Sequence, residues 1–216
     1  MDKTYILFDL DGTLTDPGMG ITNSVAYALG HFGITVTDRS ELYSFIGPPL
    51  VDSFMEYYGF TEEKAKEAVA LYRVYFSDRG WAENTVYDGI EALLAELRAA
   101  GKTLLVATSK PQAFADRILT HFGLDKYFTV ICGAPMHAPR GYGKADVIRE
   151  ALAAAGVDDR ATAVMVGDRH HDIDGAAAVG IASVGVLYGY GDRDEHEAAG
   201  AGVIAESVDA LKRILL

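Results

Sequence analysis

Cysteine is almost absent from this chain of 216 residues. Cys132 is the single cysteine, so no disulfide can form within the chain, which fits a reducing compartment. Basic residues are also scarce: 19 Lys and Arg stand against 31 Asp and Glu, giving a net charge of −12. We therefore expect no basic face that neutralises the phosphates of a nucleic acid. To bind an anion, such an acidic protein must concentrate its few cations, or a metal, in one place.

Long apolar runs are missing as well. No window approaches the ~18 apolar residues that a membrane-spanning helix needs. The apolar run within MDKTYILFDLDG is too short for a signal peptide and is interrupted by Asp9. We expect a cytoplasmic monomer or homodimer that binds neither a membrane nor a nucleic acid polymer.

Strand and helix patterns alternate over most of the chain. Five short apolar runs, each bounded by Gly, Asp or a hydroxyl residue, are typical of buried parallel strands. They are Tyr5–Phe8, Thr103–Ala107, Thr129–Cys132, Ala163–Val166 and Ser183–Leu187. Helical spacing of apolar residues marks Ile90–Ala100, with Asp88 as its expected N-cap, Gln112–Phe122 and Ala145–Ala155. The alternation predicts an α/β fold with a doubly wound parallel sheet.

One region breaks this alternation. Between Met19 and Asn84 the patterns are helical, over Ile21–Phe32, Leu50–Tyr58 and Glu62–Phe76, with Thr61 as a cap of the third. We expect the tyrosines and phenylalanines that recur there to pack between helices. The sequence therefore predicts a helical domain at residues 17–84, inserted into an α/β core made of residues 1–16 and 85–216.

Polar and charged side chains follow the predicted strands. In an open α/β sheet, ligands bind at the carboxyl ends of the strands, which meet at one edge. The side chains expected at that edge are Asp9, Asp11, Thr108, Ser109, Lys110, Lys144, Asp168 and Asp172. The sequence thus predicts a site that combines carboxylates, hydroxyls and lysines.

Asp9 and Asp11 are two residues apart, so in an extended segment they project to the same side. Two unpaired carboxylates at that distance repel one another, and a hard divalent cation relieves the repulsion. Mg²⁺ suits such a site because it prefers oxygen ligands, and Asp168 can supply a further carboxylate. The acid that remains of the first pair can then donate a proton.

Four short motifs occur in a fixed order: FDLDGTLTD, VATSK, Lys144 and VGDRHHD. Together they resemble the motifs of the haloacid dehalogenase-like (HAD) superfamily, whose first motif reads DxDGT. The resemblance covers essentially the whole chain, and it includes a helical cap inserted after the first motif. It implies a HAD-like Rossmannoid core and a phosphatase of the phosphoglycolate phosphatase-like branch.

The resemblance also implies roles for individual residues. Asp9 would attack phosphorus and form an aspartyl-phosphate, and Asp11 would protonate the leaving alcohol and then activate water. The implied phosphate ligands are Thr108, Ser109 and Lys144, with Lys110 as a rival that is expected to support the second-motif loop. The implied Mg²⁺ ligands are Asp9, Asp11, Asp168 and Asp172, together with the backbone carbonyl of Leu10.

Three stretches, DPGMGITNSVAYAL, FIGPPL and VLYGYG, resemble the bacterial 5′-nucleotidase-like group of this branch. Ile46, Gly47 and Pro48 would then help to select the substrate. We expect a Mg²⁺-dependent phosphomonoesterase acting on a small phosphorylated metabolite, phosphoglycolate or a nucleoside monophosphate. Two alternatives remain open: a phosphomutase of the β-phosphoglucomutase type and a non-catalytic phosphate-binding module.

Several of these residues also have structural interpretations. Thr108 and Ser109 can simply cap the next helix. The pair His170-His171 is expected to lie in a polar loop rather than to bind a transition metal. The stretch YGYGDRDE, which begins at Tyr188, is expected to be a loop that leaves the fifth strand.

Overall fold

The computed structural model describes residues 1–139 and 141–216, which divide into two compact units. One unit consists of Met1–Thr15 and Val86–Leu216 and contains the large sheet; the other, Asp16–Thr85, is mainly helical. Two short strands, β2 (Thr15–Asp16) and β3 (Thr85–Val86), lie where the chain passes between the units. That the helical unit acts as a cap over an active site stays a prediction.

The described residues of the first unit form a sheet of six parallel strands in the order β5-β4-β1-β6-β7-β8. The central strand β1 pairs with β4 on one side and β6 on the other, so that Leu7 lies opposite both Leu105 and Met165. This topology confirms the predicted α/β fold class. The strands are β1 (Tyr5–Phe8), β4 (Thr103–Pro111), β5 (Val130–Ala134), β6 (Ala163–Gly167), β7 (Ala182–Val186) and β8 (Val203–Ala205).

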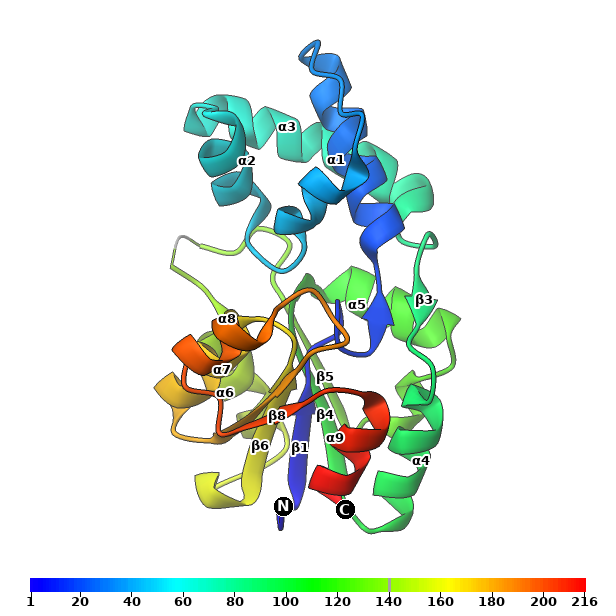
Figure 1. The fold of residues 1–216 in the computed structure, drawn as a ribbon, viewed down its shortest axis with the longest axis vertical. Coiled ribbons are helices and arrows are strands. Elements are labelled where there is room, and N and C mark those ends of the chain that lie inside the picture. Colours follow the sequence, from blue (N-terminus) through cyan, green and yellow to red (C-terminus); the bar gives the residue numbers. More distant parts are fainter. Residues whose placement is uncertain (140) are drawn as a thin grey trace. The chain divides into compact units, whose positions relative to one another are not determined.

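Helices cover both faces of this sheet (Figure 1). On one face, Leu7, Leu105 and Met165 form a fully buried cluster with residues of α6 and α7, such as Ile148 and Ala176. On the other face lie α4 and α9 (Figure 1). The helices of this unit are α4 (Ile90–Ala99), α5 (Gln112–His121), α6 (Lys144–Ala154), α7 (His170–Val179), α8 (Arg193–Ala198) and α9 (Val208–Leu215), with short 3-10 turns η3 (Asp125–Tyr127) and η4 (Arg160–Thr162).

Aromatic side chains hold the helical unit together. Its elements are α1 (Gly18–His31), η1 (Arg39–Phe45), α2 (Leu50–Tyr58), α3 (Glu62–Tyr75) and the π-helical turn η2 (Phe76–Gly80). Phe45 meets Phe54 edge-on with ring centroids 4.9 Å apart, and Tyr72 stacks on Phe76 at 5.4 Å. Thr61 caps α3, as predicted, by accepting the Lys64 N–H at 3.3 Å.

The structure corrects several local predictions. The N-cap of α4 is Gly89, which adopts a left-handed φ of 85°, and not Asp88. His170 and His171 begin helix α7 and do not lie in a loop. Strand β4 continues to Pro111, four residues beyond the predicted end, with a register shift against β5 between Thr108 and Pro111. No helix among the described residues is long and apolar enough to cross a membrane.

Candidate functional site

Asp9 continues the central strand by one residue. Its backbone N–H donates to the Val166 carbonyl of the neighbouring strand at 2.9 Å, which fixes the main chain at this point. Because side chains alternate along a strand, Asp9 projects to the same side as Leu7, the side covered by α6. Lys144 is the first residue of α6, and its Nζ lies 2.8 Å from Asp9 Oδ1.

The Lys144 ammonium is buried among acceptors. Its Nζ also lies 2.8 Å from Asp172 Oδ1 and donates to the Ala107 carbonyl at 3.1 Å. Burial alone would lower the pKa of Lys144, but Asp172 and Asp9 outweigh it and raise the pKa, so the lysine stays charged. Gly175 makes room for the side chain, since a Cβ there would lie 2.9 Å from Lys144 Cγ.

Asp168 directly follows β6 and is fully buried. Its Oδ2 accepts the Tyr190 N–H at 2.8 Å, and its Oδ1 accepts the Thr13 hydroxyl at 3.3 Å. Gly12, with a φ of 80°, lies so close that a Cβ there would be 2.1 Å from Asp168 Oδ2. Only glycine therefore fits the turn after Asp11, for reasons of both backbone conformation and space.

Asp172 lies in the first turn of α7 and caps it, because its Oδ2 accepts the Arg169 N–H at 3.2 Å. Burial raises the pKa of Asp172 to about 6 in spite of the opposing effect of Lys144. Burial also raises the pKa of Asp168 well above its ordinary value, and the charges of Asp172 and Asp9 add to that increase. Holding these carboxylates ionised is therefore costly without a further cation.

Asp11 has a different environment. Its Oδ2 lies 2.8 Å from Lys110 Nζ, whereas its buried Oδ1 has no hydrogen-bond partner among the described residues. Burial raises the pKa of Asp11, and Lys110 opposes this increase without cancelling it. A carboxyl group with a raised pKa and an unsatisfied oxygen can both donate and accept a proton.

A divalent cation fits the group formed by Asp9, Asp168 and Asp172. One carboxylate oxygen from each lies within 4.8 Å of the other two, and all three residues are buried. Oδ1 of Asp9 and Oδ1 of Asp172 each lie 2.8 Å from Lys144 Nζ and have no other partner among the described residues, so each keeps a lone pair for a further ligand. Three carboxylates against one lysine leave an excess of negative charge, and a hard cation with oxygen ligands would balance it.

The remaining predicted ligands lie as follows. The Leu10 carbonyl accepts the N–H groups of Thr13, Leu14 and Thr15 at 3.3, 2.9 and 3.0 Å and so closes the turn; that it also binds a metal stays a prediction. The Asp11 side chain, predicted as a fourth carboxylate ligand, is outside the Asp9, Asp168 and Asp172 group and pairs with Lys110.

Thr108 and Ser109 lie within β4 and not in a loop after it. Thr108 is buried, and its Oγ1 accepts the Lys110 N–H at 3.3 Å. The helix that follows, α5, has Pro111 at its N-cap and no capping side chain, so neither hydroxyl caps it. That Thr108 and Ser109 bind phosphate stays a prediction.

In the helical unit, Ile46 is buried and Gly47 has a φ of 105°. A part of Ile46, Gly47 and Pro48 in substrate selection likewise stays a prediction.

Sequence reasoning missed the segment that leaves β7. Tyr188 and Tyr190 contact the turn after Asp11 and the Asp168 side chain from more than 20 positions away in the sequence. Local periodicity carries no signal of such contacts. The available signal was the pair of glycines that flank Tyr190, since a glycine near a site often marks a close backbone approach.

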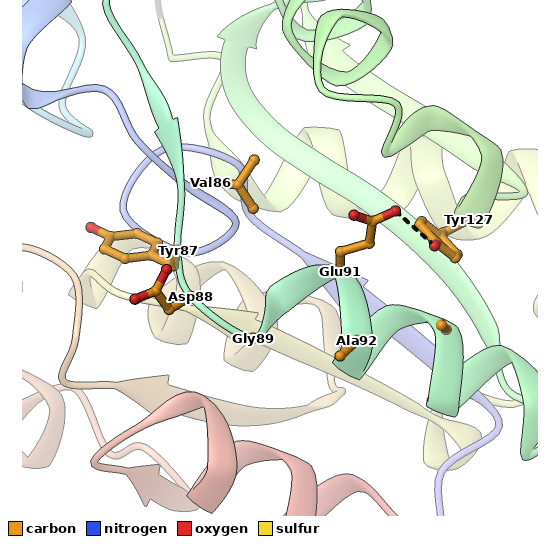
Figure 2. Close-up of a pocket in the computed structure, with 8 residues that line it drawn as sticks. Val86, Tyr87, Asp88, Gly89, Glu91, Ala92 and Tyr127 are labelled. Atoms are coloured by element: carbon orange, nitrogen blue, oxygen red, sulfur yellow. Dashed lines mark hydrogen bonds between the residues drawn. The ribbon is translucent and has the colours of Figure 1, made fainter.

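A separate open cavity of about 570 Å³ lies along the N-terminal half of α4 (Figure 2). Tyr87, Asp88, Glu91 and Tyr127 are among its lining residues, and Tyr127 donates its hydroxyl hydrogen to Glu91 at 3.1 Å. None of the carboxylates grouped around Lys144 lines this cavity, so we assign it no part in the chemistry.

Comparisons with known proteins point to one family. The model of haloacid dehalogenase-like hydrolases matches residues 6–186. A 5′-nucleotidase of Pseudomonas aeruginosa is 46% identical over 210 residues, which cover 97% of this chain and 94% of that protein. Tyrosine-protein kinase PtkA of Mycobacterium tuberculosis is 45% identical over 213 residues, covering 97% and 72% of the two chains. The crystal structure of a predicted phosphatase from Clostridium acetobutylicum matches with a TM-score of 0.94 and 49% identity, over 99% and 98% of the chains.

Proposed function

The chain belongs to the haloacid dehalogenase-like hydrolase family and is a phosphatase, and we propose that it is a Mg²⁺-dependent phosphomonoesterase that works through an aspartyl-phosphate on Asp9. The observation that carries the proposal is the position of Asp9. Its carboxylate stands on the rigid end of the central strand, 2.8 Å from the buried Lys144 ammonium and within 4.8 Å of ligand atoms of Asp168 and Asp172.

In the proposed first step, an Asp9 carboxylate oxygen attacks phosphorus. The phosphorus–oxygen bond to the alcohol breaks, and Asp11 gives its proton to the departing oxygen. In the second step, water attacks the phosphorus, Asp11 takes the proton from that water, and the bond from phosphorus to Asp9 breaks. Inorganic phosphate and both original carboxyl groups are the products, so the cycle closes without any other reactant.

Charge neutralisation would come from two sources. The Lys144 ammonium can bind phosphoryl oxygens while it holds Asp9 in position. Mg²⁺ bound by Asp9, Asp168 and Asp172 would supply additional positive charge to the phosphoryl group. The raised pKa of Asp11 supports its role as an acid, because it keeps more of the protonated form near neutral pH.

We propose a small phosphomonoester as substrate, with nucleoside monophosphates ahead of phosphoglycolate. The resemblance of DPGMGITNSVAYAL, FIGPPL and VLYGYG to 5′-nucleotidases supports this order. So does the 46% identity to the 5′-nucleotidase of Pseudomonas aeruginosa, over nearly the whole of both chains. Phosphotyrosine belongs among the test compounds because the Mycobacterium tuberculosis relative is a tyrosine-protein kinase.

The test is phosphate release from a panel of nucleoside monophosphates, phosphoglycolate, sugar phosphates, phosphotyrosine and a generic aryl phosphate. Each compound is assayed with Mg²⁺ and with EDTA. We expect release that requires Mg²⁺ and is fastest with one class of compound. If none of the compounds releases phosphate, the phosphomonoesterase proposal is contradicted; a phosphorylated isomer formed from a sugar phosphate would favour a mutase.

Replacing Asp168 by Asn should make the metal-free protein more stable while weakening its binding of Mg²⁺. Because the buried Asp168 carboxylate faces Asp172 and Asp9, removing its charge should stabilise the metal-free protein by about 1–2 kcal/mol, or ~2–8 °C in Tm. Mg²⁺ should raise the Tm of the wild type, since it binds only the folded state, and should have little effect on Asp168→Asn.

Thermal unfolding with EDTA and with Mg²⁺ measures both effects. Asp174→Asn is a suitable control because Asp174 lies on the same helix but is exposed and pairs with His170. This control should keep the Mg²⁺-dependent increase in Tm. If Mg²⁺ raised the Tm of Asp168→Asn as much as that of the wild type, Asp168 would not be a metal ligand.

A further inference from the structure

The segment that leaves β7, which we call the β7 exit segment, consists of Tyr188, Gly189, Tyr190 and Gly191. We propose that this segment is a positioning element of the active site, which fixes the Asp168 carboxylate and the turn after Asp11 in the arrangement needed for metal binding and turnover. The inference rests on the proposed function and goes beyond it, because none of the four residues contributes a reacting group.

The backbone of the segment holds Asp168. The Tyr190 N–H donates to Oδ2 at 2.8 Å, while the Thr13 hydroxyl donates to Oδ1 at 3.3 Å. With a donor on each oxygen, the plane of the Asp168 carboxylate is fixed. Hydrogen bonds of this kind orient metal ligands, and losing one typically costs about 10–100-fold in metal affinity or activity.

The Tyr188 hydroxyl holds the turn. It donates to the Thr13 carbonyl at 3.1 Å, and burial raises the pKa of Tyr188, so the hydroxyl remains protonated at every pH of interest. The Tyr188 ring is itself held by Tyr87, which meets it edge-on with centroids 5.1 Å apart. Thr13 therefore joins three elements: the turn after Asp11, the Asp168 carboxylate and the β7 exit segment.

The two glycines allow the segment to approach this closely. A Cβ at Gly189 would lie 2.2 Å from the Gly12 carbonyl oxygen and 2.4 Å from Asp168 Cβ. A Cβ at Gly191 would lie 2.0 Å from the Asp168 carbonyl oxygen. These distances are far below van der Waals contact, and the nearest atom at each position is a backbone carbonyl oxygen, so any side chain at either position must push the segment away from Asp168.

Glu195, in helix α8 beyond the segment, is hydrogen-bonded to the start of helix α7. Glu195 Oε1 accepts the His170 N–H at 2.7 Å and the Arg169 Nε–H at 2.9 Å. Arg169 and His170 directly follow Asp168, so Glu195 holds the chain just after Asp168 while the Tyr190 N–H holds its carboxylate. Asp168, a proposed metal ligand, is thus held by residues that are not themselves among the proposed ligands.

The first test is Gly189→Ala, with Gly202→Ala as the matched control. A Cβ at Gly202 would make only an ordinary contact, 3.4 Å from the Ser183 carbonyl oxygen. Mn²⁺ binding in the absence of substrate is followed by EPR, and kcat and KM are measured with an aryl phosphate and Mg²⁺. We expect Gly189→Ala to bind Mn²⁺ about 10–100-fold more weakly and to lose kcat to a similar extent, with KM changed by only a few-fold.

The second test is Tyr188→Phe, which removes only the hydroxyl, with Tyr127→Phe as control. Tyr127→Phe likewise removes one hydroxyl hydrogen bond, to the Glu91 carboxylate on the surface of α4 (Figure 2). We expect Tyr188→Phe to lower kcat and Mn²⁺ affinity about five-fold, the equivalent of one neutral hydrogen bond, and Tyr127→Phe to change neither. Comparing Tyr188→Phe with Tyr127→Phe tests the positioning role of the segment even if Gly189→Ala does not fold.

The outcomes separate the inference from the function on which it rests. A wild type that neither binds Mn²⁺ nor releases phosphate contradicts the proposed function. A wild type that does both, while Tyr188→Phe and any folded Gly189→Ala match it in Mn²⁺ affinity and kcat, overturns the positioning role alone. A lower Tm in these variants with unchanged Mn²⁺ affinity and kcat would also overturn it, because the segment would then serve only stability.

Discussion

Asp9→Asn is expected to reduce turnover by at least about 10³-fold, because an amide cannot attack phosphorus as the carboxylate does. The fold should survive. Asn has almost the same shape as Asp, and Lys144 keeps its contacts with Asp172 and with the Ala107 carbonyl. The measurement is single-turnover and steady-state phosphate release with Mg²⁺, together with circular dichroism and Tm.

Asp16→Asn is the matched control for this change. Asp16 belongs to the same FDLDGTLTD stretch as Asp9 but lies at the start of the helical unit. Its Oδ1 accepts the Gly18 N–H at 2.9 Å. We expect its turnover to stay within a few-fold of the wild type. Turnover close to that of the wild type in Asp9→Asn would show that another group is the nucleophile.

Lys144→Met should combine a large kinetic defect with a large loss of stability. Met has a similar length, but it removes the ammonium that lies 2.8 Å from both Asp9 and Asp172. Leaving buried carboxylates uncompensated costs about 3–5 kcal/mol, and losing one charged ligand of the transition state costs about 10²–10³-fold in kcat. Mg²⁺ should restore part of the stability, since it neutralises the same carboxylates.

Lys110→Met is the comparison that separates the two buried lysines. Lys110 Nζ lies 2.8 Å from Asp11 Oδ2. Its loss should therefore affect proton transfer by Asp11 more than it affects phosphate binding. Its removal also takes away the charge that lowers the pKa of Asp11. We expect a smaller loss of kcat/KM than in Lys144→Met. If kcat/KM fell further in Lys110→Met than in Lys144→Met, Lys110 and not Lys144 would be the main phosphate ligand.

Much of the sheet could be predicted because its strands are buried on both faces and therefore consist of nearly continuous apolar residues. Tyr5–Phe8 is found with the predicted bounds. Strand β8 has only three residues, Val203–Ala205, and its pattern is too short to stand out. The N-cap of α4 was predicted incorrectly because the left-handed conformation of Gly89, and not a side chain, begins that helix.

The convergence of the charged residues could be predicted from topology alone. Once β1, β4 and β6 are neighbours, the residues after them must meet at one edge, and the structure places Asp9 and Asp168 there, with Asp172 in the first turn of α7 and Lys144 at the start of α6 beside them. The partner of each lysine could not be predicted in this way. Lys110 reaches Asp11 because β4 extends past Thr108, and that extension depends on pairing with β5.

The contacts of Tyr188 and Tyr190 were also beyond sequence reasoning. They join residues 175 and 22 positions apart, and their donors are a hydroxyl and a backbone amide. Any non-proline residue would supply the amide, so residue type carries no information about that bond. The only sign in the sequence is the glycine at positions 189 and 191. The reason for these glycines becomes clear only from the short distances to Gly12 and Asp168 in the structure.

The central claim is that the phosphoryl group passes through Asp9, and the most direct test is to trap it there. Asp11→Asn is mixed with an aryl phosphate, whose leaving group needs no proton, so that losing the base slows only the second step. The reaction is quenched in acid, and the peptide that contains Asp9 is analysed by mass spectrometry. We predict a phosphoryl group on Asp9 that hydroxylamine removes and that is absent when Asp9 is also changed to Asn. A phosphoryl group on another residue, or phosphate release with no modified protein, would contradict the account.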